Sequence, residues 1–254
     1  MKKKILSLCV VGALALTAVG GTLAYFTDTD SQVNVMTTGK VDISQDEQQR
    51  GADDKLVDFV QGKALMPMVD TREDKTVNPV VNGYFDEAMN NVVDKIVTVK
   101  NEATAGAINQ DAYVRTILAF ETNTEYAEGT DTVLRDGKTI FDTYIGTLGD
   151  FELLDRDTIE VNGVEYVLAV KVYEDALAPQ DVSDPSLKQI FLSPNANNEV
   201  ATLFGDDYTI LALSQGAQTA GFDTAKAALD AAFGDVETID EATLIEWLSV
   251  CVTE

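Results

Sequence analysis

The chain has 254 residues, 45% of them hydrophobic, and carries 18 Lys and Arg against 43 Asp and Glu. Its formal net charge of −25 argues against binding to nucleic acid or to an anionic membrane, because both require a basic surface. It contains no histidine, which excludes Ser-His and Cys-His catalytic pairs and removes the most common zinc ligand.

The N-terminus has the layout of a secretory signal peptide. Lysines fill positions 2–4, and the run from Ile5 to Val19 is almost wholly apolar. Thr22 and Ala24 place small residues before a cut at Tyr25. We therefore predict a leader over residues 1–24, recognised by the peptidase at these three positions, and a secreted product. No second apolar run of membrane-spanning length follows, so no membrane association is expected after cleavage.

Alternation of apolar and polar residues predicts several strands, since successive side chains of a strand point to opposite faces. The segment 112–121 alternates in this way. Asn162-Gly163 separates the runs 158–161 and 164–173 and favours the type I′ turn of a hairpin. Apolar residues on both faces of 164–173 predict that this strand is covered on both sides. A further strand is expected over 207–214.

Helix signals are fewer. Asp223 and Asp240 are suitable N-caps, and Gly234 is a suitable helix end. We predict C-terminal helices over 223–233 and 241–250. Two shorter helices are expected, one beginning at Asn197 or Asn198 and one over 87–93.

The remaining segments are predicted to be connections. The polar stretches 44–54 and 122–137 are expected to be loops, and Pro179, Pro185 and Pro194 punctuate a long connection. Because strands dominate, we predict a mainly β, two-sheet sandwich with helical inserts and C-terminal helices. The length suits one such domain, assigned to residues 45–254.

No catalytic residue is assigned. Asp28, Asp30 and the pair Asp206-Asp207 are weak calcium candidates because carboxylate oxygens suit that ion, with ordinary solvated carboxylates as the alternative. No other cofactor is expected. Cys251 is the one cysteine outside the leader, so it has no partner for an intramolecular disulfide, and a buried thiol is expected.

Three motifs follow one another near the N-terminus. They are Gly20-Gly21-Thr22-Leu23-Ala24 at the end of the leader, Phe26-Thr27-Asp28 after it, and Thr38-Gly39-Lys40-Val41-Asp42-Ile43. Together they resemble the start of the TasA/camelysin family of secreted bacterial proteins. Two later regions resemble the family's central strand pair (95–102 and 111–117) and its C-terminal strand and helix (210–215 and 227–230).

The resemblance implies a jelly-roll form of the sandwich and release by a SipW-type signal peptidase. In TasA-like fibre formers the N-terminal segment completes the sheet of the next subunit. We therefore expect residues 25–44 to be the first mature strand and a candidate donor strand. The side chains predicted to act in donation are Tyr25, Phe26, Val33, Val35 and Met36. Such a contact runs head to tail and builds a filament.

Three functions stay open. The favoured one is a subunit of an extracellular biofilm-matrix fibre, which self-associates and has an accessory matrix subunit as a further expected partner. The second is a monomeric cell-surface or secreted binding protein, in which residues 25–44 form an ordinary first strand of their own sheet. The third is a camelysin-like metalloprotease, disfavoured because no His-Glu-x-x-His motif is present.

Overall fold

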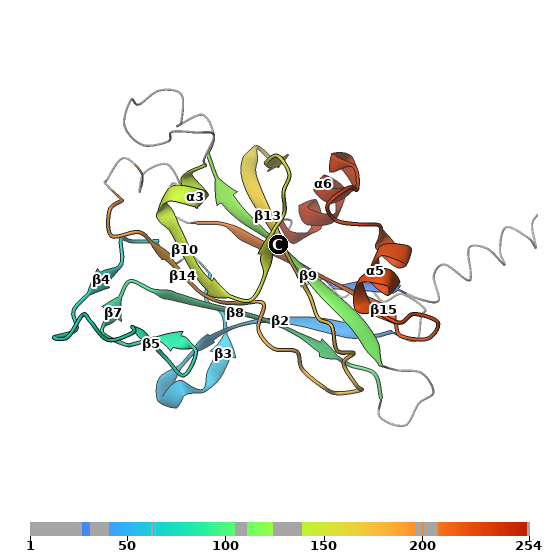
Figure 1. Ribbon diagram of the computed structural model, residues 1–254, viewed down its shortest axis with the longest axis horizontal. Helices are drawn as coiled ribbons and strands as arrows, with labels where there is room; N and C mark the ends of the chain where they lie inside the picture. Colours follow the sequence, from blue (N-terminus) through green and yellow to red (C-terminus); the bar gives the residue numbers. More distant parts are fainter. Residues whose placement is uncertain are drawn as a thin grey trace, which may run out of the picture.

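The computed structural model describes residues 27–30, 41–61, 63, 65–104, 111–123, 139–196, 200 and 208–252, and these form two facing antiparallel sheets (Figure 1). Sheet 1 contains, in spatial order, β1 (Thr27–Asp30), β15 (Ile210–Gln218), β9 (Ala112–Thr122), β13 (Val164–Val172) and β11 (Glu152–Leu153), with β12 (Ile159–Val161) also paired to β13. Sheet 2 contains β10 (Ile145–Gly149), β14 (Leu187–Leu192), β8 (Val93–Asn101), β2 (Ile43–Arg50) and β3 (Leu56–Asp58). The prediction of a mainly β, two-sheet sandwich is confirmed.

Successive strands repeatedly change sheets. β8 is the middle strand of sheet 2 and β9 is the middle strand of sheet 1. The two regions expected as a central strand pair are therefore both strands, but each is paired within its own sheet, not with the other. The steps from β1 to β2, β13 to β14 and β14 to β15 also cross between sheets, as in a jelly roll.

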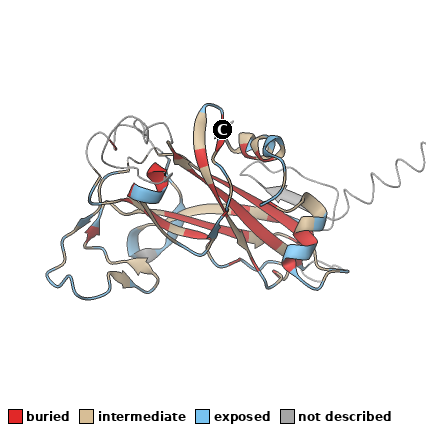
Figure 2. Ribbon diagram, turned by 45° about the horizontal axis from the view of Figure 1, so that its top comes forward, coloured by how far each residue is buried: buried red, intermediate tan, exposed pale blue. Residues whose placement is uncertain are grey.

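The main core lies between the sheets. Phe120 of β9 stacks on Phe141 with ring centroids 4.9 Å apart, and both join a buried cluster with Val97 and Leu187 of sheet 2. Figure 2 shows the buried residues running along the central strands. Removal of these side chains from water is the principal stabilising contribution to the sandwich.

The C-terminal helices form a second layer on the outer face of sheet 1. α5 (Ala225–Phe233) and α6 (Glu241–Ser249) confirm the two predicted helices. Leu244 and Leu248 of α6 are buried in one cluster with Tyr166 of β13. β13 is thus covered on both faces, as predicted, because Ala169 on its opposite face lies in the core between the sheets.

Helix caps follow the sequence closely, with one shift. Asp240 caps α6 by accepting a hydrogen bond from the Thr243 N–H. α5 is capped by Thr224, not by Asp223 as predicted, because the Thr224 hydroxyl accepts from the Ala227 N–H. Gly234 ends α5 with φ of 93°, which suits glycine.

Three short helical segments lie between and after these elements. α3 (Ile140–Tyr144) was not predicted, although Thr139 and Asp142 form a capping box at its start. Two 3-10 turns, η1 (Ala52–Asp54) and η2 (Val250–Val252), precede β3 and follow α6. Cys251, in η2, is half-buried against the cluster beneath α6, and its Sγ lies 3.5 Å from the Ala212 carbonyl.

The Asn-Gly hairpin forms as predicted. β12 and β13 pair with Val161 opposite Val164, and Asn162 and Gly163 have φ of 52° and 84°. Positive φ at both positions is the requirement of a type I′ turn.

Residues 43–50 form strand β2 where the sequence predicts a polar loop over 44–54. The segment lacks an apolar alternation, but Ile43 to Gln48 pair with Asn101 to Ile96 of β8. Gln45 is buried and hydrogen-bonded there. Long-range pairing therefore overrides the local polar composition.

The helix expected over 87–93 is also wrong. β7 (Met89–Asn90) occupies its centre and β8 begins at Val93. Asn91 between them has φ of 65°, which breaks a right-handed helix. β14 lies in the proline-punctuated connection where no strand was predicted. The helix expected from Asn197 or Asn198 and most of the loop expected over 122–137 lie outside the described residues.

A small arm extends at the end of the sandwich away from α5 (Figure 1). It contains β4 (Val69–Asp70), paired with β7, and β5 (Val80–Val81), paired with β6 (Tyr84–Phe85). The arm docks on sheet 2 through the Tyr84 ring, which lies 4.6 Å from the Arg50 guanidinium, and through a hydrogen bond from the Phe85 N–H to Gln189.

Candidate functional site

The candidate site is the edge of sheet 1 that β1 occupies. The backbone of Thr27–Asp30 pairs antiparallel with β15, with Thr27 opposite Ala217 and Asp30 opposite Ser214. β1 has four residues and is the outermost strand, whereas β15 has nine and pairs with β9 on its other side. One edge of β15 is therefore filled by β1, the first strand of the described part of the same chain. Such an edge is where chains exchange strands.

A buried polar network holds the inner face of β15. The Ser214 hydroxyl donates to Gln45 Oε1 at 2.7 Å, and Gln45 Nε2 donates to the Ala212 carbonyl at 3.1 Å. The hydroxyls of Thr116 and Ser214 lie 3.2 Å apart. All three polar side chains are buried. Because a satisfied network in a low dielectric is rigid, it fixes β15 relative to β2 of the facing sheet.

Gly216 allows the close approach of the segment leading into β2. A Cβ at this position would lie 3.1 Å from Val41 Cγ1 and 3.2 Å from Ile43 Cδ1. Gly216 is opposite Asp28 in the β1 pairing. A side chain here would push β15 away from Val41 and Ile43, so the glycine sets the position of the edge.

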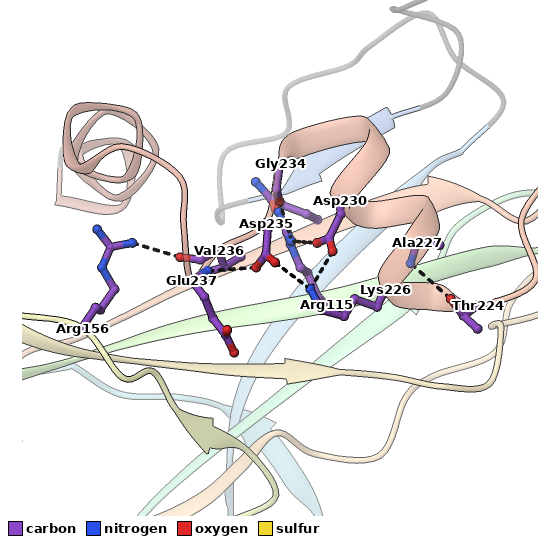
Figure 3. Close-up of polar contacts among 11 residues, drawn as sticks. Arg115, Arg156, Thr224, Lys226, Ala227, Asp230, Gly234, Asp235, Val236 and Glu237 are labelled. Atoms are coloured by element: carbon purple, nitrogen blue, oxygen red, sulfur yellow. Dashed lines mark hydrogen bonds and ion pairs between the residues drawn. The ribbon is translucent and has the colours of Figure 1, made fainter.

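Arg115 of β9 contacts the outer face of β15 (Figure 3). Its side chain is almost fully buried. Nε donates to Gln215 Oε1 at 2.7 Å, and Nη1 donates to the Gly234 carbonyl at 3.0 Å and to Asp230 Oδ1 at 3.3 Å. Burial lowers the pKa of Arg115 to about 10, against the opposing effect of Asp230 and Asp235. The guanidinium stays charged at neutral pH and joins β9, β15 and the end of α5.

Small apolar side chains complete the contact between α5 and β15. Ala217 of β15 is buried in one cluster with Ala225, Ala228 and Leu229 of α5. Ala217 is also the residue opposite Thr27. α5 therefore packs directly behind the part of β15 that pairs with β1.

A cavity of about 750 Å³ opens beside α5, next to the β11 and β13 side of sheet 1. Lys226 bridges Asp230 at 2.6 Å and Asp235 at 3.0 Å in its wall, and these hydrogen bonds raise the pKa of Lys226. Carboxylates outnumber basic groups in the lining; those that line it are Asp150, Glu152, Glu174, Asp175, Asp223, Asp230, Asp235 and Glu237. Among the described residues no group of three or more His, Cys, Asp or Glu is arranged to hold a metal.

The residues predicted as sites lie mostly outside the described part of the chain. This holds for the peptidase positions Thr22, Ala24 and Tyr25, for the other donor candidates Phe26, Val33, Val35 and Met36, and for Asp206 and Asp207. The backbone of Asp28 and Asp30 is described and lies in β1, opposite Gly216 and Ser214.

The residues that hold the acceptor strand β15 were not predicted from the sequence. The alternation predicted over 112–121 puts Arg115 on the face of its strand opposite Ala112 and Val114, where the structure has it, but no role was assigned to it. An arginine in the middle of the largely apolar 112–120 segment was the available signal, since a buried cation needs partners. Gln45, Gln215 and Gly216 carry no local signal of their own.

Over the described residues, the chain has no helix with the length and apolar character needed to cross a membrane.

The N-terminal part of the chain matches a known protein family. The model of the family described as camelysin metallo-endopeptidase matches residues 1–66. Over these residues the chain is similar to the camelysin family. The resemblance to the TasA/camelysin family indicated by the motifs over 20–43 is thereby confirmed. No curated protein and no solved structure matches the chain.

The camelysin match includes β1, β2 and β3, so it contains the strand that fills the edge. The acceptor strand β15 and the cover helix α5 lie beyond the matched residues. The camelysin description names a metallo-endopeptidase, yet the chain contains no histidine to serve as a zinc ligand or general base.

Proposed function

We propose that the protein is a secreted structural subunit of an extracellular biofilm-matrix fibre that assembles by donating its N-terminal strand. The observation that supports it most is the placement of β1, a four-residue outer strand in the camelysin-family segment, on the edge of a nine-residue acceptor. A short edge strand forms few backbone hydrogen bonds, so its exchange with an identical strand costs little.

The proposed mechanism uses the same pairing within a chain and between chains. Before cleavage, the leader tethers the strand; a SipW-type peptidase cutting between Ala24 and Tyr25 releases it. The freed segment then adds to β15 of the next subunit, where backbone hydrogen bonds give affinity and alternate side chains fill pockets. Tyr25, Phe26, Val33, Val35 and Met36 are the apolar side chains available for this. The contact is head-to-tail, so it extends without closing.

The charge and carboxylates fit an extracellular role. A strongly acidic chain stays soluble but repels its copies. Calcium bound weakly at Asp28, Asp30, Asp206 or Asp207 would reduce that repulsion, since oxygen ligands suit the ion. An accessory matrix subunit is the expected partner for starting or ending a fibre. In this proposal the protein is not an enzyme.

A second candidate is a monomeric surface protein of the same fold. The pairing of β1 with β15 of its own chain favours it, because the edge is already closed. A camelysin-like protease is the weakest candidate, since the chain has no histidine.

Negative-stain electron microscopy of residues 25–254, with and without calcium, tests the proposal. We expect filaments, and we expect a chain lacking residues 25–39 to stay dispersed while its circular dichroism remains that of a folded β protein. Dispersed particles for the full mature chain under every condition, with light scattering independent of concentration, would favour the monomeric protein.

A further inference from the structure

One row of residues crosses sheet 1 from its edge to its centre. Thr29 of β1 is opposite Gln215 of β15, and Gln215 is opposite Arg115 of β9. The row continues to the end of α5, because Arg115 donates to Asp230 and to the Gly234 carbonyl. The outermost strand is therefore connected to the cover helix through two buried side chains.

Two consecutive residues of the acceptor strand are held from opposite faces. Ser214 is bound by Gln45 on the inner face, and Gln215 by Arg115 on the outer face, each at 2.7 Å. These two residues are opposite Asp30 and Thr29. A strand held on both faces presents its free edge in one fixed register, which lowers the cost of ordering an incoming strand.

We propose that Arg115, Gln215 and Asp230 are positioning residues for strand pairing, so that the docking of α5 sets the affinity of β15 for β1, its own or a neighbour's. This rests on the proposed function only where the strand comes from a neighbouring chain. The alternative is that α5 covers apolar surface and has no influence on the edge.

Because Arg115 is charged and buried, the connection between α5 and β15 depends on the groups that pair with its guanidinium. Its guanidinium is buried, and within the described residues its Nη2 and the Nε2 of Gln215 have no hydrogen-bond partner. Among the residues that the structure describes, Asp230 is the one carboxylate that forms an ion pair with this cation. Without it the buried charge loses its direct ion pair and keeps only the more distant Asp235, so Arg115 moves toward water and Gln215 loses its donor.

Hydrogen exchange of the full processed chain tests the proposal in the monomer. Asp230→Asn should speed amide exchange about tenfold in peptides covering residues 27–30 and 213–218, with Asp230→Glu restoring the wild-type rate. Asp235→Asn is the matched control, because Asp235 also pairs with Lys226 but does not contact Arg115 through a hydrogen bond. In this variant the amide exchange of residues 27–30 should be as slow as in the wild type. Faster exchange confined to α5 in Asp230→Asn would overturn the proposal.

Fibre growth separates this proposal from the proposed function. If the wild type forms fibres, Asp230→Asn should raise the critical concentration several-fold, and Asp235→Asn should not. If the wild type forms none, the fibre proposal fails, while the exchange rate of residues 27–30 still decides whether α5 controls the edge. An unchanged critical concentration together with unchanged exchange in Asp230→Asn would contradict the positioning role.

Discussion

Arg115 Nε donates a 2.7 Å hydrogen bond to Gln215 Oε1, and both side chains are buried between sheet 1 and the C-terminal helix. The two residues are 100 positions apart in the chain. Their contact joins the central strand of the sheet to the strand that receives β1. The edge of the sandwich therefore depends on a residue that lies well inside it.

Arg115→Met should destabilise the fold strongly. The change keeps an unbranched side chain but removes the Arg115 donor from the Gly234 carbonyl, from Gln215 Oε1 and from Asp230 Oδ1, while Lys226 still donates to Asp230 Oδ2. We expect a loss of about 2–4 kcal/mol in the free energy of unfolding. Urea denaturation followed by fluorescence of Trp247, which packs 6.5 Å from the Phe233 ring, measures it.

Lys171→Met is the control for that experiment. Lys171 pairs with Asp150, whose side chain is 72% exposed, so the loss should be below about 0.5 kcal/mol. Equal losses for the two variants would contradict a special role for Arg115.

Gly216→Ala should overpack the contact between β15 and β2. The added methyl group meets Val41 Cγ1 at 3.1 Å and Ile43 Cδ1 at 3.2 Å, so we expect a cost of about 1–3 kcal/mol. Ile43→Val removes one of these methyl groups, and the double variant should recover part of the loss in a double-mutant cycle. Strict additivity of the two single changes would count against direct contact.

Much of the fold was predictable where local chemistry decides it. Asn162-Gly163 specifies its hairpin, and Asp240 and Gly234 mark helix ends, because turns and caps depend on a few neighbouring residues. β2 was not predictable, because its polar segment is a strand only through pairing with β8.

The candidate site was predictable only in part. The N-terminal segment was recognised as strand-forming, but its register against Ser214 to Ala217 joins residues far apart in the chain. No local pattern encodes such a register. Gln45 and Gln215 likewise become important only when the two sheets bring them to Ser214 and Arg115.

Asp94 should contribute to stability in a pH-dependent way. Burial raises the pKa of Asp94, but hydrogen bonds from Arg50 and Gln189, each 2.8 Å, outweigh burial and hold this pKa below its ordinary value. Since the folded-state pKa is the lower one, the carboxylate stabilises the fold above its unfolded pKa, and this contribution is lost as pH falls through the folded pKa.

Asp94→Asn should therefore be less stable than the wild type at neutral pH and lose less stability between about pH 5 and pH 2. Urea unfolding across this range measures the slope. Glu160→Gln, exposed on β12, is the control and should keep the wild-type slope. A slope for Asp94→Asn identical to the wild type would show that Asp94 does not contribute.

The purified mature chain should show no chelator-sensitive proteolysis. Zinc peptidases take histidine ligands, and the chain has none. Casein digestion with and without a metal chelator is the assay, with a zinc protease as positive control. Cleavage that the chelator abolishes, and that copurifies with the folded chain, would restore the protease function.

Strand donation is tested most directly by a disulfide between chains. Thr27 and Ala217 are opposite each other across β1 and β15, so Thr27→Cys in one mature chain and Ala217→Cys in another, both with Cys251→Ser, report pairing in trans. Strand donation predicts disulfide-linked dimers when the two chains are mixed under oxidising conditions that support assembly. If the mixture gives no dimers while a single chain with both cysteines closes its own disulfide, β1 stays in its own sheet and strand donation is wrong.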